Sequence, residues 1–146
     1  MDLRLVKSFS DACFSAKKII ELIPSNTSGL SRQELNIIDT LYSLEKEHEH
    51  VRNLEVAMKL DFSRRMIQKY VEVLSEKKLI TKYQLENDKR TYIKLTTQGK
   101  DYYAKYVEKY RKKLVRLFRN VSNTDMRTTI NTIQQIYYLV AREYSV

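Results

Sequence analysis

Residues 61–99 decide the fold, and they read DFSRRMIQKYVEVLSEKKLITKYQLENDKRTYIKLTTQG. Ser63 can cap a helix that runs to about Lys77, because a serine hydroxyl accepts a hydrogen bond from the free amides of a first helical turn. A shorter helix from about Asn53 to Lys59 precedes this one, and the turn at residues 60–62 gives the spacing of a helix-turn-helix. The shorter helix is expected to bury Leu54 and Ala57, and the longer helix Ile67, Tyr70, Val71 and Leu74.

The longer helix and the segment after it both carry basic side chains on the outside. The outward residues of the helix are Arg64, Arg65, Gln68, Lys69 and Glu72. Residues 79–85 and 91–95 alternate apolar and polar side chains, which predicts a hairpin whose polar tip is Glu86 to Arg90. A basic helix can enter the major groove of DNA, and a basic hairpin tip beside it can reach the backbone or the minor groove. The pattern therefore predicts a winged helix-turn-helix with a DNA-binding face.

The composition favours the same kind of partner. Lysine and arginine number 27 against 18 acidic residues, which gives a net charge of +9 and a pI near 9.6. Such an excess of positive charge favours a polyanion, with nucleic acid as the first candidate. No apolar run approaches the ~20 residues that span a bilayer, the amino terminus lacks the apolar core of a signal peptide, and the single Cys13 allows no internal disulfide. We therefore expect a cytoplasmic protein without a membrane partner.

The amino-terminal part of the chain predicts two helices. Apolar residues recur at helical spacing from Leu5 to Ile23, and Pro24 with the polar residues that follow it ends the first helix. Ser31 and Glu34 form a capping-box pattern that opens a second helix. The buried face of the second helix is expected to comprise Leu35, Ile38, Leu41 and Tyr42.

Beyond Gly99 the pattern returns to long helices, with apolar and aromatic residues at steps of three and four from Tyr103 to Phe118. Ser122 then opens a last helix, whose apolar face comprises Met126, Ile130, Ile133, Tyr137 and Val140. Helices this apolar need a partner, and a second copy of the chain can bury them in a two-fold dimer. The expected fold class is mainly α with a small β-hairpin wing (α+β), in a single domain spanning residues 1–146. Within that domain, residues 51–96 form the winged helix-turn-helix, and residues 1–24 and 97–146 form dimerisation helices.

Residues 88–99 read DKRTYIKLTTQG and resemble the wing of the MarR family of transcription factors. In that family an Asp-x-Arg tip leads through a strand into Leu-Thr-x-x-Gly, and the tip and strand here are particularly similar to the SarA-like branch. Residues 74–80, LSEKKLI, are similar to the family's end of the recognition helix, with Lys78 where a glycine is usual. With the flanking helices, the resemblance covers about residues 5–142. On these motifs the chain is identified as a member of the MarR family.

The resemblance implies a homodimeric, sequence-specific transcription regulator. Members place the recognition helix in the major groove of double-stranded DNA and a wing arginine at the minor groove, which here points to Arg90, with Asp88 orienting it or fixing the tip. A two-fold dimer reads the half-sites of a pseudo-palindromic operator roughly one DNA turn (~34 Å) apart. A small-molecule effector between the terminal helices would act only by favouring one spacing of the two reading heads. No cofactor and no metal are expected.

The chemistry of the side chains divides the expected DNA contacts into two kinds. The guanidinium groups of Arg64 and Arg65 can bond guanine edges or phosphates, and Gln68 can pair with adenine. Phosphate contacts are expected from Lys69, Lys82 and Lys89, which would give affinity and salt dependence without reading the sequence. The expected DNA-binding set is Ser63, Arg64, Arg65, Gln68, Lys69, Lys82, Asp88, Lys89 and Arg90.

Each of these assignments has a structural alternative. The outward arginines can form a solvated helix face, and Asp88 with Arg90 can form an ion pair that stabilises the hairpin. Cys13 is either a redox sensor, as in peroxide-responsive MarR relatives, or a buried structural thiol. The tyrosines of the terminal helices are expected in the core or the dimer interface, although they can also stack nucleobases or line an effector pocket.

Other function classes find less support in the sequence. His48 and His50 are spaced by two and lack thiolate support, so a solvated helix end is favoured over a metal site. With two histidines, one cysteine and no glycine-rich phosphate loop, the usual catalytic constellations are missing, and no enzyme is expected. A winged-helix protein-interaction module or antirepressor is the alternative function. Its mark would be an acidic or blunted recognition face, and the arginines here argue against that.

Overall fold

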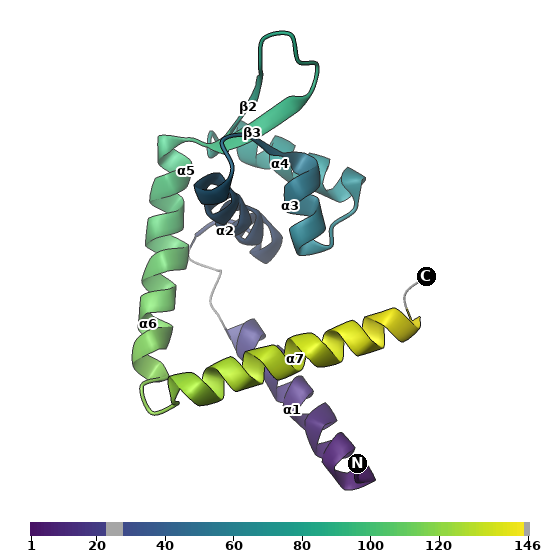
Figure 1. Ribbon diagram of the computed structural model, residues 1–146. Coiled ribbons are helices and arrows are strands. Elements are labelled where there is room, and N and C mark those ends of the chain that lie inside the picture. The colour runs from purple at the N-terminus through teal and green to yellow at the C-terminus, as the bar shows by residue number, and fades with distance from the viewer. Residues whose placement is uncertain (23–27, 145–146) are drawn as a thin grey trace. The chain divides into compact units, whose positions relative to one another are not determined.

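The computed structural model describes residues 1–22 and 28–144 (Figure 1). The chain forms two compact units, Met1–Glu108 and Lys109–Val146, and each unit is described by itself. The helix end expected at Pro24 lies outside the described residues.

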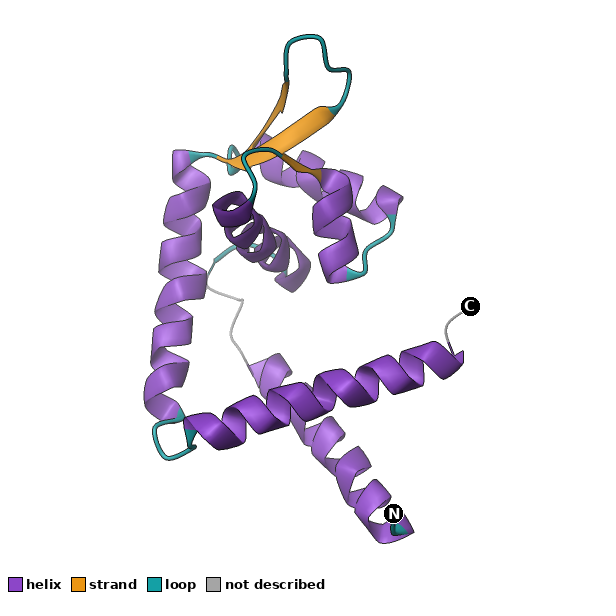
Figure 2. Cartoon of the chain, in the orientation of Figure 1, coloured by secondary structure: helices purple, strands orange, loops and turns teal. Residues whose placement is uncertain are grey.

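The first unit contains helices and a small antiparallel sheet (Figure 2). Its elements are α1 (Leu3–Leu22), α2 (Arg32–Glu47), β1 (Val51–Arg52), α3 (Asn53–Leu60), α4 (Arg64–Glu76), β2 (Ile80–Gln84), β3 (Thr91–Leu95), α5 (Thr97–Tyr102) and the π-helical segment η1 (Tyr103–Glu108). The strand order is β1-β3-β2, with Val51 opposite Ile93 and Tyr83 opposite Tyr92. The mainly α fold with a hairpin wing is confirmed, and β1 is a strand that the sequence did not predict.

The core of this unit lies between α2, α3, α4 and the inner face of the sheet. Its fully buried side chains are Ile37, Ile38, Leu41, Val51, Val56, Ile67, Val71, Leu74, Leu79, Ile80 and Ile93. Burial of this many aliphatic side chains is the main stabilising term for a unit of this size. The prediction that Leu54 is buried was wrong, since Leu54 is 49% exposed while its near neighbour Val56 is 0% exposed. In the short helix α3 the core-facing positions are Val56 and Ala57, and Leu54 faces outward.

Helix starts follow the predicted capping residues. The Ser31 hydroxyl oxygen accepts from the Glu34 amide at 3.2 Å, and the Glu34 carboxylate accepts from the Ser31 amide at 3.4 Å, so the capping box is confirmed. The other oxygen of this buried carboxylate accepts from Lys77 Nζ at 3.2 Å, which ties the start of α2 to the end of α4. Ser63 caps α4 by accepting from the Met66 amide at 3.1 Å.

The junction between β3 and α5 explains the Leu-Thr-x-x-Gly motif. The Thr96 hydroxyl donates to the Lys78 carbonyl oxygen at 2.7 Å and accepts from the Gly99 amide at 2.9 Å. The Thr96 amide donates to the Leu79 carbonyl oxygen at 3.1 Å. A Cβ atom on Gly99 would lie 2.2 Å from that same carbonyl oxygen, so only glycine fits where the helix crosses the end of the sheet.

The helix after β3 is interrupted, whereas the sequence predicted a continuous α-helix. Its first turn, α5, passes into η1, whose Tyr103 stacks on Tyr42 of α2 with ring centroids 3.7 Å apart and planes 10° from parallel. A π-helical segment carries an extra residue in its hydrogen-bonded ring, and such segments persist where packing supports them. The Tyr42–Tyr103 stack is that support, and it joins the segment to the core.

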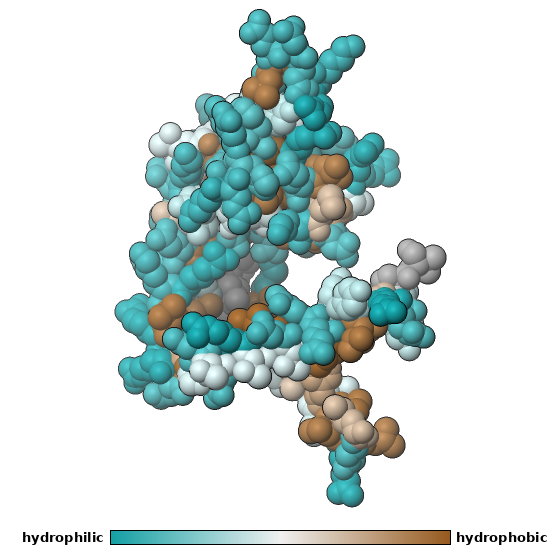
Figure 3. All heavy atoms as spheres, viewed as in Figure 1, coloured by the Kyte–Doolittle hydropathy of each residue, from teal (hydrophilic) through white to brown (hydrophobic). Residues whose placement is uncertain are grey.

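The second unit consists of α6 (Lys109–Leu117) and α7 (Asn123–Tyr144). The Ser122 hydroxyl accepts from the Asp125 amide at 3.0 Å, so the predicted start of the last helix is confirmed. Its apolar stripe is exposed in the single chain, with Ile133 at 51% and Tyr137 at 70%. The helix α1 in the first unit is exposed in the same way, and Figure 3 shows apolar side chains gathered around the amino-terminal helix, while most of the wing is hydrophilic. None of the described helices combines the length and apolar character that crossing a membrane requires.

Candidate nucleic-acid interface

The outward side of α4 presents a row of basic and polar side chains, which we call the α4 face. It comprises Arg64, Arg65, Gln68 and Lys69, all of them exposed. Two local features bring this face to the surface. Asp61 closes α3 in the left-handed region at φ 55°, with its amide donating to the Ala57 carbonyl, and Ser63 then starts α4 as its cap. The sharp turn reverses the chain, so that α4 buries Ile67 and Val71 and leaves the arginines outside.

A hollow of about 480 Å³ lies beside the first turns of α4. Arg64, Gln68 and Ile67 line one side, Leu54 and Met58 of α3 line another, and Thr91 at the start of β3 closes it. A second hollow of about 390 Å³ adjoins Gln68 and is lined also by Glu72 and Lys82. The space between the helix and the wing is therefore open along the α4 face.

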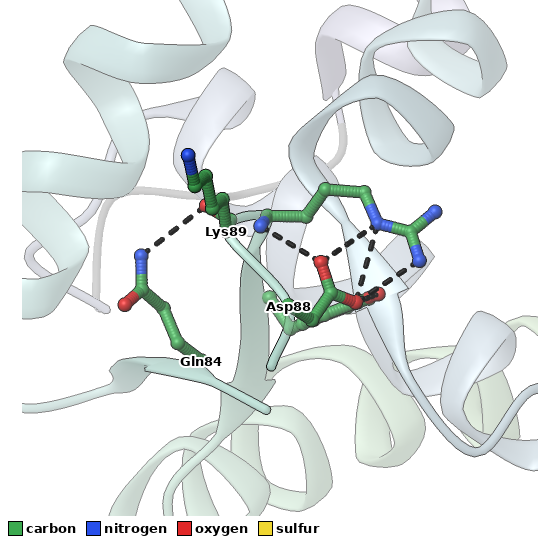
Figure 4. A network of polar contacts seen from close by, with 5 residues as sticks. Gln84, Asp88 and Lys89 are labelled. Atoms are coloured by element: carbon green, nitrogen blue, oxygen red, sulfur yellow. Dashed lines mark hydrogen bonds and ion pairs between the residues drawn. The ribbon is translucent and has the colours of Figure 1, made fainter. Parts of the chain in front are cut away.

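The wing tip, residues 86–90, is held together by Asp88 (Figure 4). Its carboxylate accepts from Arg90 Nε at 3.0 and 3.2 Å, from Arg90 Nη2 at 3.0 Å and from the Arg90 amide at 2.9 Å. The buried Tyr92 donates its hydroxyl to the same carboxylate at 2.7 Å. On the other strand, Gln84 Nε2 donates to the Lys89 carbonyl oxygen at 3.3 Å. Both predicted wing residues thus meet, and the ion pair fixes the direction of the arginine.

This network shifts the protonation equilibria of its members. Hydrogen bonds from Arg90, and then from Tyr92, hold the pKa of Asp88 well below its usual range. The bond to Asp88 in turn raises the pKa of the Arg90 guanidinium and, together with burial, the pKa of Tyr92. Asp88 is therefore ionised at neutral pH, and Arg90 keeps its charge while one edge of its guanidinium is occupied.

The remaining predicted residues lie on or beside this surface with different partners. Lys69 and Lys89 are exposed on α4 and at the wing tip. Lys82 on β2 forms an ion pair with Glu72 on α4. The Ser63 hydroxyl is engaged as the cap of α4. Of the predicted set, Gln68 lines both hollows, with Arg64 in the first and Lys82 in the second, and each DNA contact stays a prediction.

A cluster at the base of the wing was not found by sequence reasoning. His50 Nδ1 and the Tyr83 hydroxyl lie 2.8 Å apart, and the His50 ring lies 5.4 Å from that of Tyr92. The ring of Tyr83 lies 5.7 Å from Tyr92. Burial, followed by the charges of Glu45 and Glu49, raises the pKa of Tyr83. The sequence signalled only part of this cluster, since both tyrosines occupy predicted strands. The approach of His50 was not predictable, because it follows from the unpredicted pairing of β1 with β3.

The two minor candidates of the sequence are placed as follows. Cys13 is exposed on α1, so the expectation of a buried thiol is wrong for the described chain, and a sensing role stays a prediction. His50 contacts the wing tyrosines, while His48 ends α2. Within residues 1–22 and 28–144, no three histidine, cysteine or acidic side chains gather in a group that can hold a metal ion.

No protein-family model and no curated protein sequence matches the chain. Solved structures do match it over nearly its whole length. A Staphylococcus aureus MarR in complex with salicylate and kanamycin is 20% identical, with a TM-score of 0.77 over 97% of this chain and 95% of that one.

Two further structures extend this likeness. A MarR-family transcriptional regulator from Silicibacter pomeroyi has a TM-score of 0.71 at 12% identity, covering 100% of this chain and 99% of its own. The S. aureus MepR–DNA complex has a TM-score of 0.66 at 17% identity, covering 93% and 94%. At such low identity these likenesses show the fold alone. The chain has the winged-helix fold of MarR-type regulators.

Proposed function

We propose, from the MarR-type fold and the basic face it presents, that the chain is a sequence-specific DNA-binding transcription regulator of the MarR family. It acts as a homodimer, with α4 in the major groove and the wing tip at the minor groove of double-stranded DNA. The observation that carries the proposal is the exposed basic α4 face, whose Gln68 lines one hollow together with Lys82 and Thr91 of the wing strands. The net charge of +9 favours the same partner.

The division of labour among the residues follows from their surroundings. Arg64 and Gln68 line the open hollow, and Arg65 is exposed on the same helix. All three have polar groups that match base edges. Arg90 is bound by Asp88 on its Nε side, which leaves the other guanidinium edge for the minor groove. Lys69 and Lys89 are exposed and suit phosphates. The MepR relative was solved with DNA, which supports the same partner for this chain.

Dimerisation and an effector belong to the same proposal. The exposed apolar stripes of α1 and α7 suit burial against a second copy of the chain, giving a two-fold reader of a pseudo-palindromic operator. The S. aureus MarR structure is a complex with salicylate and kanamycin, which supports a small-molecule effector here. Because the proposed partner is genomic DNA, we place the protein in the cytoplasm. The redox role of Cys13 is a further hypothesis, contradicted if peroxide leaves DNA affinity unchanged.

The proposal is tested by selecting bound sequences from a random DNA pool and titrating the recovered duplex by fluorescence anisotropy. Arg64→Ala and Arg65→Ala are expected to relax the base choice, each lost base contact costing about 1–3 kcal/mol of discrimination. Arg90→Ala is expected to weaken binding more uniformly across sequences. A recovered palindrome with half-sites about one turn apart supports the dimeric reader. Salt-insensitive failure to bind any fragment would instead favour a protein-interaction module.

A further inference from the structure

One lysine of the proposed DNA surface already has an anionic partner within the protein. Lys82 on β2 forms an ion pair with Glu72 on α4, so the pair bridges the helix and the wing. Both side chains are accessible, at 38% for Lys82 and 58% for Glu72. Neither group is buried, so an anion from solvent can reach and replace the carboxylate.

The location of the pair matters more than its strength. Glu72 follows Gln68 by four residues, one helical turn, and therefore lies on the same outward side of α4. Gln68, Glu72 and Lys82 all line the hollow of about 390 Å³ between helix and wing. A duplex seated on the α4 face would bring a phosphate backbone to this hollow, where the carboxylate and a phosphate would compete for one ammonium group.

We propose that Glu72 is an internal substitute for a DNA phosphate, which occupies Lys82 and limits its contribution to binding. The inference rests on the proposed function. A DNA phosphate must displace the carboxylate before it gains Lys82, and the displaced carboxylate then repels the backbone. The pair therefore lowers the affinity for DNA of any sequence and removes about one phosphate per protomer from the salt dependence.

The test compares Glu72→Gln with the matched control Glu76→Gln. Glu76 is exposed near the end of the same helix, so its substitution makes the same change of charge without touching the Lys82 ion pair. Affinity for a fluorescent duplex of ~30 base pairs, long enough for two half-sites, is measured across a series of salt concentrations. Circular dichroism checks that each variant keeps its helix content.

Glu72→Gln frees one Lys82 in each protomer, so it is expected to steepen the slope of log affinity against log salt by about 1.8 for the dimer on two half-sites. A threefold drop in salt would then tighten binding by an extra factor of about 7. Glu76→Gln is expected to change the slope much less, because its effect is screened by distance and salt. In a Lys82→Gln background, Glu72→Gln should change the salt slope no more than Glu76→Gln does.

Two results would overturn the inference, and they are distinguishable. If Glu72→Gln and Glu76→Gln act alike, or if the gain from Glu72→Gln is independent of Lys82, then Glu72 has no special role although the protein binds DNA. If the wild-type chain and all variants show no salt-dependent binding, the proposed function itself fails, and this inference with it.

Discussion

At the scale of single residues, the decisive arrangement is the carboxylate of Asp88 between Arg90 and Tyr92. The arginine donates through its amide and its guanidinium, and the tyrosine donates its hydroxyl from the buried side. A guanidinium held at one edge loses less conformational freedom when it meets DNA than a free side chain does. The structural ion pair and the proposed DNA-binding role are thus compatible, since the ion pair would hold the arginine ready for the contact.

The lowered pKa of Asp88 predicts a pH dependence of stability. The folded-state pKa lies below the unfolded value of about 3.9, so the stabilisation is present above pH ~4 and is lost as the pH falls through the folded pKa. Asp88→Asn is therefore expected to flatten the decline of stability below pH ~4, as measured by urea unfolding at a series of pH values.

Glu86→Gln is the matched control for this experiment, because Glu86 is an exposed carboxylate of the same wing tip. Its substitution should leave the decline closer to that of the wild type. An Asp88→Asn curve parallel to the wild-type curve throughout the acid range would contradict the prediction.

The sequence predicted this site in part, for physical reasons. Asp88 and Arg90 are two residues apart at a hairpin tip, so their pairing follows from local geometry and was foreseen. Tyr92 was recognised only as a strand residue, because an alternating pattern does not show that its hydroxyl donates to Asp88. The pairing of Lys82 with Glu72 joins two elements and depends on how β2 packs against α4, which periodicity does not encode.

At the scale of elements, the end of α4 carries a residue in an unfavourable backbone conformation. Lys78 has φ 63°, in the left-handed region, while the Leu79 amide donates to the Leu74 carbonyl at 2.9 Å. This is a helix end that usually takes glycine, because a side chain in that region costs about 1–2 kcal/mol. The departure from the family pattern at this position is therefore accommodated with strain.

Lys78→Gly is expected to stabilise the protein by up to about 1 kcal/mol. It removes the strain of the left-handed conformation, but the greater conformational entropy of glycine in the unfolded chain offsets part of that gain. Thermal or urea unfolding measures the change. Glu76→Gly, two residues earlier within α4, should instead destabilise by about 1 kcal/mol. Equal losses of stability in both variants would show that the left-handed conformation of Lys78 carries no cost.

Helix starts were predicted correctly because the amide that each cap binds lies close to it in the sequence. The caps Ser31, Ser63 and Ser122 accept from amides within three residues, and all three helix starts were predicted. The strand β1 has only two residues, too few for a periodic pattern, and the π-helical segment depends on the distant Tyr42. Both were missed because their cause lies elsewhere in the sequence.

At the scale of the whole molecule, the exposed apolar stripes of the terminal helices need cover. In α7, Ile130 is 46% and Ile133 is 51% exposed in the single chain. Such stripes at three- and four-residue spacing are typical of helices that pack against another helix. In the proposed dimer a second copy supplies the cover, and the spacing of the two α4 faces depends on it.

Ile133→Glu is expected to shift the protein from dimer to monomer, because a carboxylate would be buried in an apolar contact. Sedimentation equilibrium measures the state, and DNA affinity should fall in parallel since one half-site is then read alone. Gln135→Glu adds the same charge two residues away, on the other side of the helix, and should leave the dimer intact. A variant at Ile133 that stays dimeric would place the dimer contact elsewhere.

The π-helical segment Tyr103–Glu108 has one more consequence for the chain. A π-helical ring holds one residue more than an α-helical ring, so it can take up a single extra residue within a helix. Loss of one codon inside Tyr103–Glu108 is therefore expected to narrow the ring to the α-helical width. The same loss inside α4 would instead turn every later side chain of that helix by about 100° and expose its buried face. Tyr103–Glu108 is thus a place where the length of this chain can change by one residue at little cost to the helix.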